Sequence, residues 1–150
     1  SDNLFTPLQI SMYISDIING GTRYRAHLLY KVTDYATGTV LHLEQPSPMD
    51  SIPFDQKNLA VVKEGMKNVM DNGSAASVFA GYSIPVGGKT GTAQVSANKS
   101  DNGIITVFAP FDDPELVVTC IIEQGNGGTE AGYAVRDVFD YYFKQGKWAE

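Results

Sequence analysis

The sequence predicts an α+β fold in which an antiparallel sheet of three strands packs against helices. Three strand-like segments follow one another, at about Ile84–Val95, Gly103–Ala109 and Leu116–Glu123, and a helical pattern begins after Thr129. The links between these strands are short, and short links favour antiparallel neighbours because parallel strands need a long crossover. The last strand is nearly continuous in apolar residues, so helices are expected on both faces of the sheet.

Length and composition indicate one globular domain. The chain has 150 residues, of which 43% are hydrophobic and 19% are charged, so a sizeable core is possible and wholesale disorder is excluded. A net charge of −6 argues against nucleic acid or anionic lipid as the main partner. The single cysteine cannot form an internal disulfide or a thiolate metal site. No apolar run approaches the roughly 20 residues of a membrane helix. Because the chain starts abruptly at Ser1, we expect it to be a piece of a longer protein.

The first helix is predicted to begin at Pro7. Thr6 is a good N-cap, proline suits the first helical position, and Gln9 completes a capping box with Thr6. Apolar residues recur on one face at Ile10, Ile14 and Ile17. The pair Gly20-Gly21 is expected to end the helix.

The segment between this helix and the sheet is predicted to hold a hairpin and a second helix. Ala26–Glu44 reads as two extended pieces around a turn at residues 36–38, and Pro46, Pro48 and Pro53 are expected to break the chain after the hairpin. The second helix begins after Asp55 and ends by Gly73. Its apolar stripe is Leu59, Val62, Met66 and Val69. Residues 74–82 are expected to form a loop with a turn of helix.

The remaining elements complete the predicted β-β-β-α half. Residues 96–102 are interpreted as the connection between the first two strands, and residues 112–114, Asp-Asp-Pro, as the turn before the third. The final helix has its apolar side at Ala131, Val135, Val138, Phe139 and Tyr142.

The most unusual segment, residues 86–94, reads Val-Gly-Gly-Lys-Thr-Gly-Thr-Ala-Gln. Glycine weakens a strand and marks a place where something approaches the backbone closely. In a regular strand Lys89 and Thr90 point to opposite faces. A cation, a hydroxyl and a bare backbone edge would suit an extended ligand with a carboxylate, which could pair with the strand while Lys89 and Thr90 bind its acid group.

Two other interpretations compete for this segment. A phosphate-binding loop ends in Gly-Lys-Thr, but its pattern also needs an earlier glycine at a fixed spacing, which is absent here, and a helix after it, whereas the next residues are strand-like. The second is a plain hairpin strand whose lysine is solvated. On the tripeptide Lys-Thr-Gly alone this second interpretation is the favoured one, since three residues often match by chance.

The context of the segment resembles the transpeptidase domain of penicillin-binding proteins. Residues 2–9, Asp-Asn-Leu-Phe-Thr-Pro-Leu-Gln, resemble the start of a helix in that family, and residues 88–94 match its third active-site motif over the whole motif. Residues 108–110, 115–123 and 136–139 resemble the two subsequent strands and the closing helix, in the same order. The resemblance covers essentially the whole chain and implies a β-lactamase/transpeptidase-like fold. The Thr-Pro-Leu-Gln and Gly-Thr-Ala-Gln segments look more like a class B protein than a secreted β-lactamase.

The resemblance implies a serine-type D,D-transpeptidase of peptidoglycan synthesis. In the family, the serine of an S-x-x-K motif attacks the D-Ala-D-Ala stem peptide, an amine then accepts the acyl group, and β-lactams trap the serine. That serine lies well before the Thr-Pro-Leu-Gln segment, so the nucleophile is not in this chain. Residues 1–150 would be the incomplete C-terminal part of one transpeptidase domain, and the isolated chain is expected to be inactive.

The same resemblance implies roles for five residues. Lys89 is expected to supply positive potential to the terminal carboxylate and the catalytic proton network, and Thr90 to donate its hydroxyl to that carboxylate. Gly91 would let the substrate approach, and the backbone N–H of Thr92 would be one of two oxyanion donors. Gln94 is expected to join Thr90 and Gly91 in substrate binding. The resemblance implies no cofactor and no metal.

Other polar residues are given structural interpretations. Residues 96–99, Ser-Ala-Asn-Lys, have the letters of S-x-x-K but come after the Lys-Thr-Gly strand in a turn-like segment, so they are interpreted as a surface turn, as are the Ser-Asp-Asn triplets at 1–3 and 100–102. Cys120 is expected to be a small core residue. His27 and His42 lack clustered partners at the spacing of metal ligands.

Partners and location are also expectations from the family. They are the peptidoglycan stem peptide and β-lactams, at the extracytoplasmic face of a bacterial membrane to which an N-terminal helix outside this chain would anchor the protein. The strand Leu116–Glu123 would pair with the missing N-terminal part of the domain or with another copy. Nucleic acid is not expected. The alternatives are a β-lactam-sensing domain and a non-catalytic assembly module of the same fold.

Overall fold

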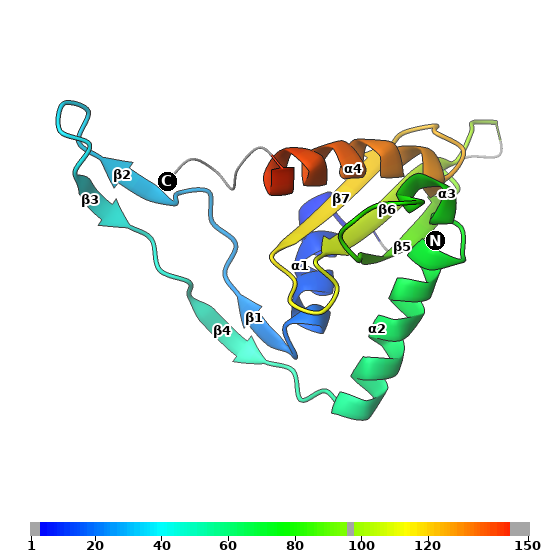
Figure 1. Cartoon of the computed structure of the whole chain (residues 1–150), viewed down its shortest axis with the longest axis horizontal. Coiled ribbons are helices and arrows are strands. Elements are labelled where there is room, and N and C mark those ends of the chain that lie inside the picture. The colour runs from blue at the N-terminus through cyan, green and yellow to red at the C-terminus, as the bar shows by residue number, and fades with distance from the viewer. Residues whose placement is uncertain (1–3, 96–97, 145–150) are drawn as a thin grey trace.

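The computed structural model describes residues 4–95 and 98–144. Its body is built on an antiparallel sheet of β5 (Gly87–Ala93), β6 (Asn102–Ala109) and β7 (Leu116–Ile122), in the order β5-β6-β7 (Figure 1). The predicted three-stranded sheet is confirmed. The first strand starts later than predicted because Pro85 has no N–H for a ladder; its carbonyl instead accepts a hydrogen bond from Phe111 N at 2.8 Å.

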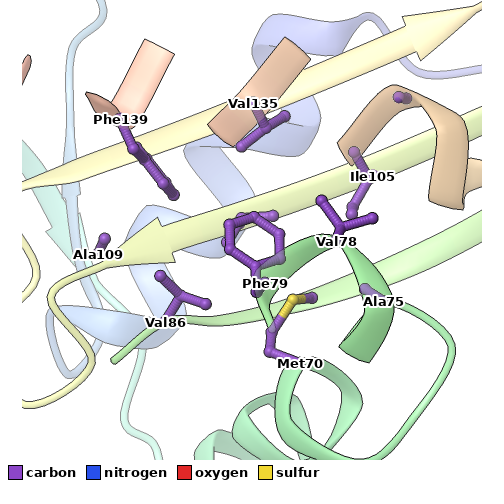
Figure 2. Close-up of a cluster of buried hydrophobic side chains, with 11 residues drawn as sticks. Met70, Ala75, Val78, Phe79, Val86, Ile105, Ala109, Val135 and Phe139 are labelled. Atoms are coloured by element: carbon purple, nitrogen blue, oxygen red, sulfur yellow. The ribbon is translucent and has the colours of Figure 1, made fainter. Parts of the chain in front are cut away.

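Helices cover both faces of this sheet, as the sequence predicted. Side chains alternate along β6: Ile105, Val107 and Ala109 face the cluster that includes α4 (Gly128–Lys144), whereas Phe108 joins the cluster of α1 (Pro7–Ile18). In the first cluster, Val135 and Phe139 of α4 point toward the sheet (Figure 2). The strand β7 contacts both helices, which explains its nearly continuous apolar sequence.

The helix α1 begins as predicted. Thr6 N donates to Gln9 Oε1 at 2.8 Å and Gln9 N donates to Thr6 Oγ1 at 3.2 Å, so the capping box is complete. Gly20 and Gly21 come after the helix with φ of 83° and 112°. A Cβ at Gly21 would also lie 2.2 Å from the carbonyl oxygen of Ile52, so only glycine fits this crossing.

A long two-stranded ribbon extends from the body between α1 and α2 (Gln56–Asp71) (Figure 1). At its base β1 (Thr22–Tyr24) pairs with β4 (Pro48–Ser51), and at its tip β2 (Lys31–Thr33) pairs with β3 (Val40–Leu43). The hairpin and its turn at residues 36–38 are confirmed. The expectation that the prolines break the chain here is wrong for β4, because Pro48 stands at the first position of its strand, where proline is tolerated.

The helix α2 (Gln56–Asp71) is capped by Asp55, whose Oδ1 accepts from the backbone N–H of Lys57 and Asn58. Its buried residues are Leu59, Met66 and Met70. The predicted apolar stripe therefore matches the buried face only in part, because Val62 lies at the edge of that face and is 48% exposed. The same error occurs in α4. Ala131, Val135 and Phe139 are buried there, but Val138 is 45% exposed.

The predicted turn of helix in the loop after α2 is α3 (Ala76–Phe79). This loop contributes more to the core than its small, polar sequence indicated, since Ala75, Val78 and Phe79 are all buried (Figure 2). Among the helices of the described segments, none has the length and apolarity needed to span a bilayer.

Candidate functional site

The strand β5 lies at the edge of the sheet. It pairs with β6 from Gly87 opposite Phe108 to Ala93 opposite Asn102, and no other strand of the described segments pairs with it. Lys89 stands opposite Thr106 and Thr90 opposite Ile105. Because directly opposite residues share a face and Thr106 and Ile105 alternate, Lys89 and Thr90 leave the strand on opposite faces, as predicted.

The first two glycines of the strand are required by the protein's own core. A Cβ at Gly87 would lie 2.4 Å from the ring of Phe108, and one at Gly88 would lie 2.4 Å from the carbonyl oxygen of Thr106 and 2.8 Å from Met70 Cε. Gly91 differs, because the nearest atom to its Cβ would be Ile104 Cβ at an ordinary 3.7 Å. Packing among the described residues therefore explains two glycines of the motif and leaves Gly91 unexplained.

Lys89 keeps its charge at the surface. Its side chain is exposed, and Nζ donates to the carbonyl oxygen of Thr90 at 2.8 Å. This contact holds the ammonium group beside the strand rather than letting it extend into solvent. An ammonium has three N–H donors, so the bond to one carbonyl leaves donors for an acid group.

Thr90 is tied to a loop distant in sequence. Its Oγ1 lies 2.6 Å from Ser74 Oγ, and the carbonyl oxygen of Ser74 accepts from Thr129 Oγ1 at 3.0 Å. Sequence reasoning missed Ser74 and Thr129. Both are ordinary loop or helix-end residues in the sequence, and their meeting depends on packing across 16 and 55 residues of chain.

The two other predicted site residues lie farther along the same strand. Thr92 is exposed opposite Gly103, and Gln94 is exposed just beyond the end of β5. Lys89, Thr90, Gly91 and Thr92 are thus presented on one edge strand, and Gln94 extends the row. An edge strand with a cation and hydroxyls can bind an extended acidic ligand by strand addition.

Only some of the residues that were given structural interpretations lie in the described part of the chain. The triplet at 100–102 is not wholly a turn, because Asn102 is the first residue of β6. Asn102 Oδ1 accepts from Gln124 N at 2.9 Å and the carbonyl oxygen of Asp101 accepts from Asn126 N at 3.0 Å, which ties this segment to the β7–α4 loop. Ser96 and the triplet at 1–3 lie outside the described residues. Cys120 is a half-buried free thiol that packs against the α4 cluster. Across 4–95 and 98–144, no three His, Cys, Asp or Glu side chains gather at a metal-binding distance.

Comparison with known proteins gives one consistent result. Residues 4–140 match the family model of the penicillin binding protein transpeptidase domain. The peptidoglycan D,D-transpeptidase MrdA of Haemophilus influenzae is 32% identical over 93% of this chain and 24% of its own length. Penicillin-binding protein 2A of Bacillus subtilis is 28% identical over 93% of this chain and 22% of its own. The chain therefore spans about a quarter of the length of these relatives.

Solved structures agree on the fold. A structure of Pseudomonas aeruginosa PBP2 in complex with WCK 5153 superposes with a TM-score of 0.75 at 29% identity and covers 93% of this chain and 31% of that one. The imipenem acyl-enzyme of penicillin-binding protein A from M. tuberculosis gives a TM-score of 0.81 at 20% identity, over 96% of this chain and 32% of that one.

Proposed function

Because this chain belongs to the penicillin-binding protein transpeptidase family, we propose that it supplies the substrate-binding strand of a class B peptidoglycan D,D-transpeptidase. The observation that carries the proposal is the strand β5. It is an edge strand that presents Lys89, Thr90 and Gly91 together, and its third glycine has no packing role among the described residues.

The chemistry of the strand fits an acyl donor that ends in a carboxylate. The stem peptide, or a β-lactam in its place, lies along β5 as an added strand. Lys89 supplies positive potential, Thr90 donates its hydroxyl to the carboxylate, and Gly91 leaves room for the ligand backbone. Gln94, exposed beyond the strand, binds the more distant part of the ligand.

The reaction itself is an acyl transfer through serine. The nucleophile comes from outside this chain and attacks the penultimate D-alanine carbonyl, so that D-alanine leaves and an acyl-serine forms. The N–H of Thr92 is one of two donors to the oxyanion, an interaction whose loss typically costs about 10²–10³ in rate. The amine of a neighbouring stem peptide then takes the acyl group and frees the serine.

At the opposite edge of the sheet, we propose that β7 contacts the rest of the protein. The strand β7 pairs only with β6 among the described strands, and all seven of its residues keep some exposure. An apolar edge of this length readily pairs with another strand. We assign it to the remainder of the transpeptidase domain, on the extracytoplasmic face of the membrane, or to a second copy when that remainder is absent.

Acylation of the complete protein that carries this sequence tests the proposed site. Lys89→Ala and Thr90→Val should each slow acylation by benzylpenicillin about tenfold to a hundredfold, the range for losing a hydrogen bond to a charged group. Lys57→Ala is the matched control, since Lys57 is an exposed lysine in the first turn of α2. Rates equal to wild type in both site variants would remove Lys89 and Thr90 from the site. A complete protein that benzylpenicillin acylates, but that does not transfer the acyl group of a D-Ala-D-Ala stem peptide to an amine, would instead be a β-lactam sensor.

A further inference from the structure

The hydroxyl of Thr90 has a partner within the protein. We propose that Ser74 is a positioning residue that orients the Thr90 hydroxyl toward the ligand's acid group, and that Thr129 holds Ser74 in place. The inference rests on the proposed function, because it concerns how Thr90 meets a carboxylate. It adds two residues, from the α2–α3 loop and from the first turn of α4, to a site that otherwise lies on one strand.

The hydroxyls of Ser74 and Thr90 together leave one hydrogen for a hydrogen bond to a ligand. The two oxygens lie 2.6 Å apart, at the short end of the range for O–H···O bonds, and either hydroxyl can be the donor. Two hydroxyls carry two hydrogens, and one is used between them, so one hydrogen remains for a third group. When Ser74 donates, the remaining hydrogen is that of Thr90. Accepting a hydrogen bond also polarises the Thr90 hydroxyl and makes it a better donor.

The loop that carries Ser74 is fixed on both sides. The carbonyl oxygen of Ser74 accepts from Thr129 Oγ1 at 3.0 Å, and the next residue, Ala75, is fully buried with its N–H donating to the carbonyl oxygen of Val69 at 3.2 Å. A functional hydroxyl is most effective when its supporting groups are themselves held by packing and hydrogen bonds.

The first turn of α4 is held against β5 by close backbone packing. A Cβ at Gly128 would lie 2.0 Å from the carbonyl oxygen of Ile104 and 3.1 Å from that of Gly91. Only glycine allows this approach, and it places the next residue, Thr129, beside the strand that carries Thr90. The β5 strand, the α2–α3 loop and the start of α4 therefore converge on the Thr90 hydroxyl.

A purely structural tether would behave differently from a positioning residue. If the Ser74–Thr90 bond only anchors the loop, its loss lowers the stability of the protein and changes the rate of acylation by the same factor for all ligands. If it orients the Thr90 hydroxyl, its loss matters only for ligands with an acid group, and only while that hydroxyl is present. These two dependences define the experiment.

The experiment measures acylation of the complete protein by benzylpenicillin and by its methyl ester, which lacks the acid group. Ser74→Ala should slow the reaction with benzylpenicillin about threefold to tenfold, the effect of one neutral hydrogen bond, and leave the reaction with the ester unchanged. Ser74→Thr, which keeps the hydroxyl, should restore most of the rate. Thr129→Val should slow acylation by benzylpenicillin less than Ser74→Ala does and should also leave the reaction with the ester unchanged. Thr129→Ser, which keeps the hydroxyl, should not slow acylation.

A double-mutant cycle separates this inference from the proposed function. In a Thr90→Val background, Ser74→Ala should have no further effect. Equal slowing with the acid and the ester, or the same factor in both backgrounds, would overturn the positioning role. If Thr90→Val is slow but Ser74→Ala is not, the inference fails and the proposed site stands. If Thr90→Val itself reacts like wild type, the proposed site fails.

Discussion

The glycines of residues 87–91 serve two different purposes, close packing in the core and an open surface for a ligand. Gly87 and Gly88 have no space for a side chain because Phe108, Met70 and the backbone of Thr106 already occupy it. Gly91 has that space, and nothing in the described part of the chain uses it. The segment is therefore core at its start and open surface at its centre.

This difference predicts opposite consequences for the same substitution. Gly87→Ala should lower the free energy of unfolding by about 1–3 kcal/mol, because the new methyl group overlaps the buried Phe108 ring. Gly91→Ala should leave stability nearly unchanged but slow acylation in the complete protein. Thermal unfolding and acylation rates of the two variants test this. A stability loss at Gly91 as large as that at Gly87 would contradict it.

Tyr82 makes stability depend on alkaline pH. Burial, together with the Asp140 carboxylate, raises the pKa of Tyr82 to about 12. The folded protein therefore holds this proton when the unfolded chain, with a tyrosine pKa of about 10, has lost it. The stabilisation from Tyr82 is fully present below about pH 10 and is lost as pH rises through about 12. Urea unfolding between pH 9 and 12 should show this decline, and Tyr82→Phe should reduce it. An equally steep decline in the variant would contradict this assignment.

Among the elements, α4 has the most sharply defined buried face. Phe139 is fully buried against the sheet and packs in the cluster of Figure 2, whereas its neighbour Val138 is half exposed. The helix depends on this face for its place on the sheet, since most helical stability in proteins comes from the packing of an amphipathic face rather than from helix propensity.

The helix therefore offers two adjacent substitutions with different expected costs. Phe139→Ala should lower the free energy of unfolding by about 3–5 kcal/mol through lost burial and a cavity. Val138→Ala, on the same turn, should change it by less than about 1 kcal/mol because little buried surface is lost. Urea unfolding of the two variants compares them. Similar losses would show that the buried face of α4 is assigned incorrectly.

The elements also show what the sequence could and could not predict. Local signals were sufficient for α1, whose capping box is contained in residues 6–9, and for β6 and β7, whose apolar runs are bounded by turn residues. Signals that depend on distant partners were missed. The β1–β4 pair joins segments 27 residues apart, such as Arg23 and Asp50, and the buried face of α4 depends on where the sheet lies.

The residues of the site also divide into those that the sequence could indicate and those that it could not. Lys89, Thr90, Gly91, Thr92 and Gln94 could be proposed from the sequence because one contiguous motif contains them. Ser74 and Thr129 could not, because no local pattern distinguishes them from ordinary serine and threonine residues. They join the site only through the folding of the α2–α3 loop and α4 onto β5.

At the scale of the whole molecule, the chain leaves much apolar surface uncovered. Besides the open edge of β7, the ribbon that projects from the body in Figure 1 exposes large apolar side chains. They include Leu28, Leu29, Tyr30, Tyr35 and Leu41. Surfaces of this kind are usually covered by another chain or another part of the same protein.

The chain on its own should therefore self-associate. Light scattering after size exclusion should show dimers or larger species, with β7 as the pairing edge. Ile122→Lys, which places a charge at the exposed end of β7, should reduce association. Val61→Lys on the exposed face of α2 is the control and should not. A sharp, concentration-independent monomer with a cooperative melt would show that β7 is not a reactive edge.

Taken as a whole, this chain is proposed to supply the ligand-binding strand of the transpeptidase but not its nucleophile. Intact mass measurement after incubation with benzylpenicillin, on the chain alone and on the complete protein, tests this division of roles without relying on any substitution. We expect no adduct on residues 1–150 alone, and one acyl group on the complete protein at a serine outside these residues. A stoichiometric acyl adduct on any serine of the chain, Ser96 included, would show that the division is wrong.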